Sequence, residues 1–171
     1  MTDDYDGDVR SAIAPTIGSD EFIPPSAFSI WAMANGVSND PNALGANGQK
    51  NLFNFAFGIN PVTGGSGELQ YAGTLAGGGT ITATGLPRTW VEPSGSGVDF
   101  RALFVRRKDY VAAGLTYTPQ FSADLLTWAD SAAAPAVLAD DGVNQIVSVP
   151  YPAFIAGKKA RFFRISVALA P

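Results

Sequence analysis

From residue 68 onward, apolar and polar residues alternate along the chain, and this period of two restricts the fold more than any other feature. Such alternation is typical of β-strands that have one packed face and one face in water. Glycine and proline are frequent, with 19 and 12 residues, and they separate the alternating stretches as turns. The sequence therefore predicts a mainly β fold, an antiparallel β-sandwich of the jelly-roll or immunoglobulin-like kind. The predicted strands lie at 68–75, 80–86, 88–93, 98–105, 115–121, 145–151 and 161–169.

Two short helices are predicted before the strands, at 26–35 and at about 49–57. Ser26 can cap the first helix, and Gly58 can end the second. The second helix is apolar around most of its circumference, so we expect it to be buried on more than one side, at the end of a sheet or in a subunit contact. The predicted organisation is an extended arm at 1–25, a two-helix segment at 26–61 and the β-sandwich at 62–171.

The chain contains no cysteine and no histidine. Their absence removes disulfides, thiol nucleophiles, catalysis of the Ser-His-Asp and Cys-His kinds, and the commonest zinc ligands. Catalysis by carboxylates or lysine remains open, but no specific constellation of such residues stands out, so we predict a protein that is not an enzyme. No apolar run approaches the ~18 residues of a membrane-spanning helix, and no membrane span is predicted.

Charge is distributed unevenly along the chain, whose formal net charge is −4. Residues 1–21 carry six acids and one arginine, whereas residues 101–171 carry eight Lys or Arg and five acids. Ordinary solvated surface is one interpretation, and head-to-tail attraction between copies is the other. An extended, proline-broken arm can add to the open edge of a sheet in another copy, so self-assembly through the arm is predicted. The apolar residues of this assembly arm are Ile13, Ile17, Phe22 and Ile23.

Several motifs follow one another in the second half of the chain. A strand ends in Arg-Arg, the segment LTYTPQFSADLLTW comes next, and a DDG turn and the strand RFFRISV complete the series. Over roughly residues 26–170 this order resembles the C-terminal β-sandwich module of long secreted or surface, autotransporter-associated proteins of environmental Gram-negative bacteria. The resemblance implies an extracellular or cell-surface β-sandwich without assigned catalysis. The matching residues are Arg106, Arg107, Leu115, Tyr117, Asp124, Leu125, Trp128, Asp141, Gly142, Phe162, Phe163, Arg164 and Val167.

That family also tends to carry a dockerin-like or EF-hand-like loop upstream, where this chain has GANGQKNLFNFAFGINP. If Gly48 takes the sixth position of such a loop, four ligand positions can be assigned. They fall on Ala43, Gly45, Asn47 and Asn54. None of these residues is a carboxylate, and neutral amides are weak partners for a hard dication. We therefore expect a degenerate loop that keeps a geometric role and does not bind calcium.

A separate calcium candidate is the acidic stretch DYDGD near the start of the chain. Asp4, Asp6 and Asp8 have the spacing of the first ligands of an EF-hand loop, but Pro15 occupies the twelfth position and cannot supply a bidentate carboxylate. The alternative interpretation is a frayed acidic terminus. Apart from calcium at these three aspartates, no cofactor is predicted.

Two basic stretches, FVRRKD and GKKARFFR, would form one patch if both lay at the same end of the sandwich. Such a patch would suit an anionic polysaccharide or the acidic arm of another subunit, and ordinary solvated loops are the alternative. Nucleic acid is not a predicted partner, because the protein is acidic overall and contains no recognition motif. The residues of the predicted basic patch are Arg106, Arg107, Lys108, Lys158, Lys159 and Arg161.

Aromatic residues could form a platform on which sugars stack. The candidates are Tyr71, Trp90, Tyr110, Trp128 and Tyr151, although core packing is the expected role of Trp128. The prediction that best fits the sequence is an extracellular structural protein or module that assembles head to tail into a surface filament or matrix. The alternative is a module for carbohydrate binding or for cell-surface attachment or sorting.

Overall fold

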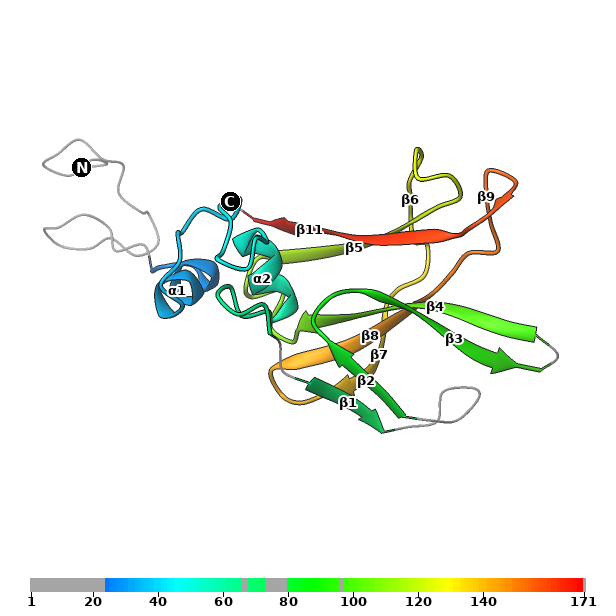
Figure 1. The fold of residues 1–171 in the computed structure, drawn as a ribbon. Coiled ribbons are helices and arrows are strands. Elements are labelled where there is room, and N and C mark those ends of the chain that lie inside the picture. Colours follow the sequence, from blue (N-terminus) through cyan, green and yellow to red (C-terminus); the bar gives the residue numbers. More distant parts are fainter. Residues whose placement is uncertain (1–23, 66–67, 73–79, 96, 171) are drawn as a thin grey trace, which may run out of the picture.

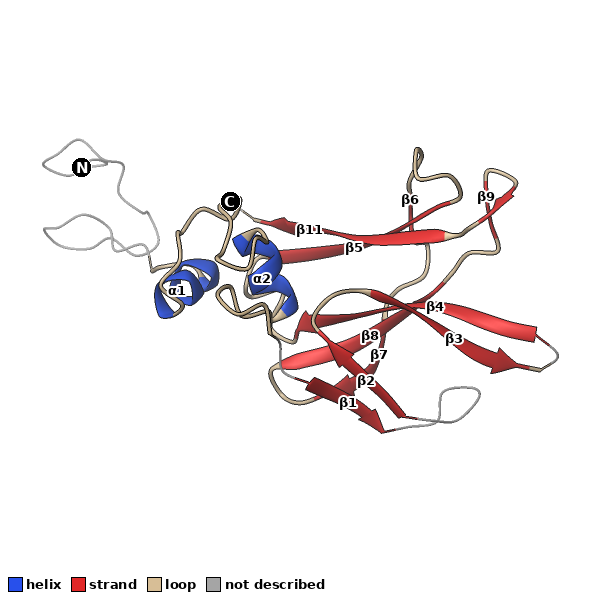
Figure 2. Cartoon of the chain, viewed as in Figure 1, coloured by secondary structure: helices blue, strands red, loops and turns tan. Residues whose placement is uncertain are grey.

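The computed structural model describes residues 24–65, 68–72, 80–95 and 97–170. These residues form a mainly β fold in which antiparallel sheets pack together, with two short helices at one end (Figure 1). Beyond the helices the described chain consists of strands and the loops that join them (Figure 2). The fold class predicted from the alternating pattern, a β-sandwich with a short helical segment, is therefore confirmed.

The two helices begin and end where local sequence favours it. Helix α1 (Ala27–Ala34) begins after Ser26, whose side-chain oxygen accepts a hydrogen bond from the Ser29 N–H at 3.1 Å. Helix α2 (Asn51–Phe57) ends at Gly58, whose left-handed conformation (φ +64°) suits a residue without a Cβ. In the described parts of the chain, no helix is both long and apolar enough to cross a membrane.

The described residues form eleven strands, and every stretch that the alternating pattern assigns to a strand contains one. The larger sheets have the orders β3-β4-β8-β7 and β11-β5-β6, whereas β1 with β2 and β9 with β10 form hairpins. The strands β6, β7, β9 and β10 were not predicted. Strands β6, β9 and β10 have two residues each, which are too few to show a period, and β7 reads AVLAD, which does not alternate between apolar and polar residues. The strands are β1 (Glu68–Ala72), β2 (Thr80–Thr84), β3 (Arg88–Ser94), β4 (Gly97–Arg107), β5 (Leu115–Ser122), β6 (Ala129–Asp130), β7 (Ala136–Asp140), β8 (Asn144–Pro150), β9 (Phe154–Ile155), β10 (Lys158–Lys159) and β11 (Phe162–Leu169).

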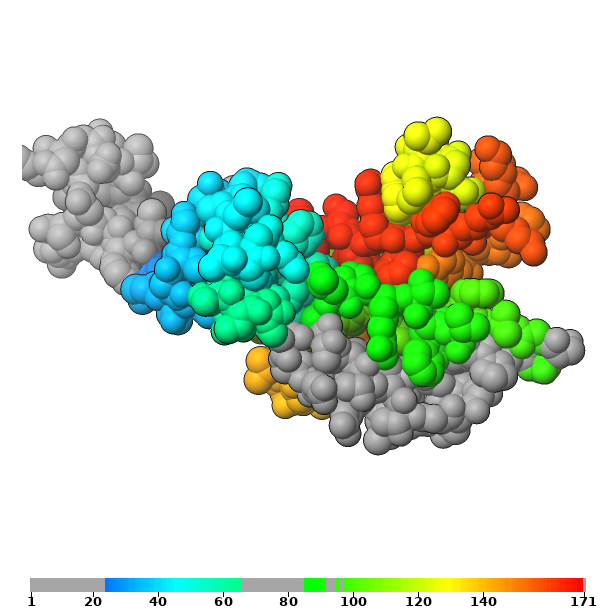
Figure 3. Space-filling model, in the orientation of Figure 1, coloured from blue at the N-terminus to red at the C-terminus, as the bar shows by residue number. Residues whose placement is uncertain are grey.

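One apolar core joins the helices to both larger sheets. The rings of Phe28 in α1 and Phe55 in α2 pack edge to face, with 5.4 Å between their centroids. Phe57 in α2 contacts Tyr117 in β5 in the same manner at 6.0 Å, and Tyr117 also lies against Phe104 in β4. Helix α2 thus closes one end of the sandwich. On the molecular surface, the atoms of the helical segment lie directly against those of the strands (Figure 3).

Tyr117 also ties α2 to β5 through a buried hydrogen bond. Its hydroxyl donates to the carbonyl oxygen of Ala56 at 2.5 Å and accepts from the backbone N–H of Arg107 at 3.4 Å. The Ala56 carbonyl lies in the last turn of α2, where no later helical N–H can reach it. Burial raises the pKa of Tyr117 above its ordinary value, so the hydroxyl remains protonated and keeps donating.

Strand β4 departs from the prediction of one packed face and one wet face. Residues 102–105 are all buried, whereas Phe100, an apolar residue between the polar Asp99 and Arg101, is 46% exposed. Leu103 and Val105 form a second apolar cluster with Ile146 of β8, on the face turned away from the main core. The β1–β2 hairpin contacts β4, β7 and β8 and so forms a third layer. The alternation was misread here because the buried stretch is continuously apolar.

Candidate functional site

The loop before α2 follows the path of a calcium-type loop and joins its two key side chains directly. Leu44 and Lys50 form a short antiparallel bridge across the loop, and Gly48 takes φ +78° at the sharp turn. Asn47 and Asn54 occupy ligand positions five and twelve and form a reciprocal pair of amides. The Nδ2 of Asn47 donates to Oδ1 of Asn54 at 2.8 Å, and the Nδ2 of Asn54 donates to Oδ1 of Asn47 at 3.3 Å.

The side-chain nitrogen of Asn54 lies where the oxygens of the loop converge. It also donates to the backbone carbonyl of Gln49 at 3.3 Å, and Gln49 holds loop position seven, which supplies a backbone ligand in EF-hands. Asn54 is fully buried, and a Cβ added at Gly45 would lie only 3.0 Å from this nitrogen. An uncharged N–H donor therefore gathers oxygens that a cation would gather in a carboxylate-rich loop.

The same network directs the chain that leaves α2. Asn47 donates its backbone N–H to the carbonyl of Pro61 and its side-chain Nδ2 to the carbonyl of Asn60, both at 3.0 Å. The side-chain oxygen of Asn60 accepts from the N–H groups of Val62 and Thr63 at 2.8 and 2.9 Å. The loop thus holds the segment that leads toward β1.

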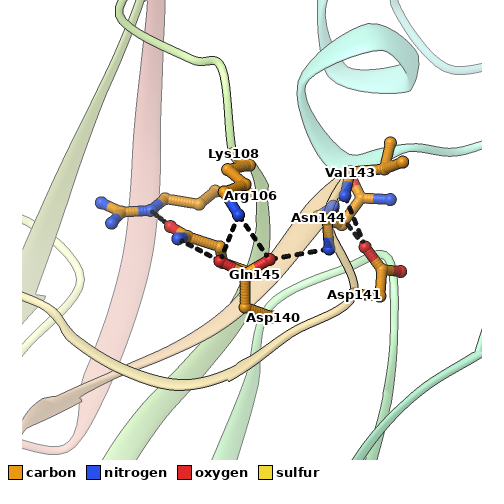
Figure 4. Close-up of polar contacts among 8 residues, drawn as sticks. Arg106, Lys108, Asp140, Asp141, Val143, Asn144 and Gln145 are labelled. Atoms are coloured by element: carbon orange, nitrogen blue, oxygen red, sulfur yellow. Dashed lines mark hydrogen bonds and ion pairs between the residues drawn. The ribbon is translucent and has the colours of Figure 1, made fainter.

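A second polar network joins the end of β4 to the start of β8 (Figure 4). Arg106 donates from Nε to Oε1 of Gln145 at 3.0 Å, and Gln145 donates from Nε2 to Oδ2 of Asp140 at 3.1 Å. Lys108 forms an ion pair with the same carboxylate at 3.1 Å. The hydrogen bonds from Gln145, from the Gly142 N–H and from Lys108 hold the pKa of Asp140 below its ordinary value. Both cations are therefore engaged within the protein.

The DDG segment forms the turn between β7 and β8, and its second aspartate organises it. Oδ1 of Asp141 accepts from the backbone N–H groups of Val143 and Asn144 at 2.8 and 2.6 Å, and Gly142 takes φ +93° (Figure 4). The backbone N–H of Lys108 donates to the carbonyl of Val143 at 2.9 Å and fastens the turn to the end of β4. These contacts give the network a structural role at the end of the sandwich near α2.

The six predicted basic residues do not form one patch. Arg107 pairs with Asp109 at 2.8 Å, and its guanidinium lies 4.5 Å from the ring centroid of Phe55 in α2. Its hydrogen bonds hold the pKa of Asp109 below the ordinary value. Lys158–Lys159 and Arg161 lie at the opposite end of the sandwich, where β11 begins (Figure 1). The separation arises because β5 begins near the end of β4 and β11 pairs with β5 in antiparallel fashion.

A row of planar polar groups crosses the outer face of the β11-β5-β6 sheet. The Nε of Arg164 donates to Oε1 of Gln120 at 2.7 Å, and the Nε2 of Gln120 donates to Oδ1 of Asp130 at 2.7 Å. The Arg164 guanidinium also lies 4.2 Å from the ring centroid of Trp128. The polar positions of the two alternating strands pointed to a wet face, but sequence reasoning did not identify this row.

Trp128 does not lie in the core, so that prediction was wrong. It is half-buried, and it belongs to neither cluster of buried apolar residues in the described chain. The turn that precedes it projects from the sheet around Asp124, whose carboxylate accepts from the N–H groups of Leu126 and Thr127 at 3.0 and 3.1 Å. Leu126 is 85% exposed, so the neighbouring leucines do not make an apolar shell for the indole.

Strand β11 has a neighbour on one side only among the described strands. Ala170 donates its backbone N–H to the carbonyl of Gly114 at 2.7 Å, in register with the ladder between β11 and β5. Since alternate residues of an antiparallel strand bond to the same neighbour, the even-numbered residues of β11 bond to β5. The backbone N–H and C=O groups that point to the open side belong to Phe163, Ile165, Val167 and Leu169.

Some predicted residues lie outside the described part of the chain, namely Asp4, Asp6, Asp8, Ile13, Ile17, Phe22 and Ile23. Within the described part, no group of three or more His, Cys, Asp or Glu residues could hold a metal ion. The side chain of Tyr71 lies outside the described part of the structure. The other aromatic candidates do not gather into one platform, because Trp90 packs on the second cluster whereas Tyr110 and Tyr151 pack on the main core.

No protein-family model, curated protein or solved structure matches this chain. Two features of the described residues suggest a function. One is the open edge of β11, and the other is the polar row formed by Trp128, Arg164, Gln120 and Asp130.

Proposed function

We propose that this chain is a non-enzymatic structural module whose copies join head to tail. In this proposal the N-terminal arm, residues 1–23, of one copy adds as a strand to the open edge of β11 in the next. The observation that carries the proposal is the eight-residue β11, which has a described partner strand on one side only. A contact of this head-to-tail kind that does not close on itself produces a filament.

The open side of β11 lacks most of the features that protect natural sheet edges. Such edges usually carry lysine or proline, are very short, or are covered by another element. Residues 162–169 contain no lysine and no proline, and their sequence alternates strictly between core-facing and exposed positions. An extended peptide can form backbone hydrogen bonds with such an edge and place alternate side chains against the core.

Charge complementarity supports the arm as the occupant of this edge. Four cations lie in or just before β11, and the arm carries six acids against one arginine. Attraction between them would accelerate docking and weaken as salt screens it. The cations are Lys158, Lys159, Arg161 and Arg164.

The proposed location is extracellular or on the cell surface. The support for it is the resemblance of the spaced motifs to a module of secreted and surface proteins. A polymer that joins through backbone hydrogen bonds needs no enzyme or cofactor, which suits a surface filament or matrix.

The proposal is tested by blocking the edge in the full chain. Because the N–H of Val167 points to the open side, Val167→Pro removes an edge donor without removing a β5 bond. Val167→Ala is the matched control, since it loses the same side-chain packing and keeps the N–H. We expect light scattering and electron microscopy to show polymers for the parent and for Val167→Ala, and monomers for Val167→Pro.

Deleting residues 1–23 should also give monomers, with a thermal melt to show that the shortened chain is folded. A parent protein that stays monomeric at high concentration, or a deletion variant that still polymerises, would contradict assembly through the arm.

A carbohydrate-binding or attachment module is the second candidate, and the row of Trp128, Arg164, Gln120 and Asp130 on the outer face of the sheet favours it. A guanidinium beside an indole is suited to an anionic polysaccharide. A glycan array separates the two functions, because a structural filament subunit should retain no glycan, whereas a binding module should retain acidic glycans and lose them on Arg164→Ala.

A further inference from the structure

We infer that two projecting loops at the end of the sandwich opposite α2 bind the surface of an anionic membrane. The loops are residues 123–128, which follow β5, and the β9–β10 hairpin, residues 154–159, and together they are called the tip loops. Their exposed apolar side chains enter the lipid layer, and the neighbouring lysines and arginines meet the lipid phosphates. The inference goes beyond the proposed function, because a membrane would hold a single copy and a filament alike.

The tip loops lie side by side. Both project to the same side of the β11-β5-β6 sheet (Figure 1). The Nζ of Lys158 in the hairpin forms an ion pair with Oδ2 of Asp124 in the other loop, with 3.8 Å between the two atoms. Their atoms, yellow and orange in Figure 3, stand above the strands at this end of the molecule. One flat surface would therefore contact both loops at the same time.

The first tip loop holds two leucines outward on a backbone fixed by hydrogen bonds. Oδ1 of Asp124 accepts from the backbone N–H groups of Leu126 and Thr127, and the hydroxyl oxygen of Ser122 accepts from the N–H of Leu125 at 2.8 Å. Leu125 is nevertheless 54% exposed and Leu126 is 85% exposed. The polar groups of the loop are satisfied internally, whereas its apolar side chains meet solvent.

Leu125 also has a backbone conformation that the stability of the fold does not explain. Its φ is +66°, in the left-handed region that glycine or asparagine adopts at a lower cost. Leu125 belongs to neither apolar cluster of the described residues, so no packing in the core compensates for the strain. Strained residues of this kind gather at functional sites, and here the strain presents an apolar side chain to the outside.

Positive charge surrounds the tip loops, and the acids nearest to them are already bonded. The carboxylate of Asp124 is bound within its own loop and to Lys158, and that of Asp130 accepts from Gln120. An anionic membrane attracts each cation near its surface, and burial of apolar side chains adds to that attraction. The cations are Lys158, Lys159, Arg161 and Arg164.

The distribution of the apolar side chains fits a lipid surface better than a protein partner. Phe154 is 62% exposed in the hairpin, whereas Leu125 and Leu126 lie in the other loop, so the three side chains do not form one flat patch. A protein partner would need a complementary surface around each tip, whereas a lipid layer adapts to both. Exposed apolar side chains bordered by charged ones are typical of interaction surfaces.

The test is flotation of the full chain with vesicles, because vesicles float whereas polymers of the protein sediment. Vesicles of phosphatidylcholine alone are compared with vesicles that also contain phosphatidylglycerol. We expect binding to the mixed vesicles only. Leu126→Ser should weaken that binding about tenfold, because one leucine no longer enters the lipid layer. The matched control is Leu44→Ser, because Leu44 is also exposed but lies in the loop before α2, at the other end of the sandwich.

Two further variants separate binding from folding and test the charge. Leu125→Asn should raise Tm, because asparagine adopts the left-handed conformation more readily, and should still weaken vesicle binding about tenfold. Lys159→Gln should weaken binding about fivefold, because each lysine near an anionic surface contributes about that factor. Lys50→Gln removes the same charge at an exposed lysine beside α2 and should leave binding unchanged.

A parent chain that does not float with the mixed vesicles, or equal effects of Leu126→Ser and Leu44→Ser, would overturn the inference. If Leu126→Ser reduces self-association and leaves flotation unchanged, the tip loops are a contact between copies and the membrane role is refuted. Selective loss of flotation in Leu126→Ser, Leu125→Asn and Lys159→Gln supports the inference.

Discussion

Replacing Asn54 by aspartate should turn a loop that is stable without a metal ion into one that a bound cation stabilises. In the parent protein the Nδ2 of Asn54 donates to the Asn47 side chain and to the Gln49 carbonyl, both at 3.3 Å. Asn54→Asp puts a carboxylate oxygen in place of that nitrogen, so three acceptors face one another in a fully buried position. Both donated bonds are lost, and the buried negative charge keeps only the hydrogen bond from the Asn47 Nδ2, with no cation beside it.

An uncompensated buried charge costs about 3–5 kcal/mol at neutral pH. For a chain of this size, each kcal/mol lowers Tm by roughly 2–4 °C, so Tm should fall on the order of 10 °C. Calcium should restore part of the lost stability, because the carboxylate, the Asn47 side-chain oxygen and the Gln49 carbonyl match the ligand types of an EF-hand loop. At a hundred times its dissociation constant, a cation that binds only the folded state returns about 2.7 kcal/mol.

The assay is thermal unfolding by circular dichroism, with millimolar calcium and with a chelator. The parent should melt at the same temperature in both, whereas Asn54→Asp, and more strongly Asn47→Asp combined with Asn54→Asp, should be stabilised by calcium. Asn51→Asp is the matched control, because Asn51 is also buried in α2 but donates to the Ser38 carbonyl away from the loop centre. It should lose stability without responding to calcium.

A calcium-dependent rise of many degrees in the parent would refute this account of the loop and direct attention to Asp4, Asp6 and Asp8. Equal calcium responses in Asn54→Asp and Asn51→Asp would show that the convergence of oxygens at Asn54 is not specific.

Three further outcomes are expected. Tyr117→Phe keeps the ring but removes the hydrogen bond to Ala56, so chemical denaturation should show a loss of about 1–3 kcal/mol. Trp128→Ala should cost about 1–2 kcal/mol, less than the 3–5 kcal/mol of a buried tryptophan, because the indole is half-buried against Arg164. Asp109 and Asp140 have pKa values below their ordinary 3.8, so their stabilising effect is present above pH 3.8 and is lost as the pH falls through the folded-state values. Melts of Asp109→Asn and Asp140→Asn across that range should show a weaker dependence on pH than the parent.

The local sequence pattern was sufficient to predict most of the secondary structure. The strands at 115–121 and 161–169 follow directly from alternation, because strand residues project to opposite faces whatever the neighbours are. Ser26 and Gly58 mark helix ends because capping and left-handed conformations depend on one residue and its immediate surroundings.

The candidate site depended on contacts between segments that are distant in sequence. The basic stretches ending β4 and preceding β11 look alike in sequence, but antiparallel pairing separates them to opposite ends. Arg164 and Trp128 meet across a sheet and a turn, which no spacing along the chain reveals.

The amino-acid sequence by itself determined that the chain folds as a β-sandwich preceded by a short apolar helix that must be buried, because hydrophobic periods act locally. The tertiary structure decided that Asn54 takes the centre of the loop, that residues 102–105 of β4 are buried on both faces and that β11 has a neighbour on one side only among the described strands. Those outcomes depend on which surfaces meet, and burial, hydrogen-bond partners and free strand edges exist only after distant segments have packed together.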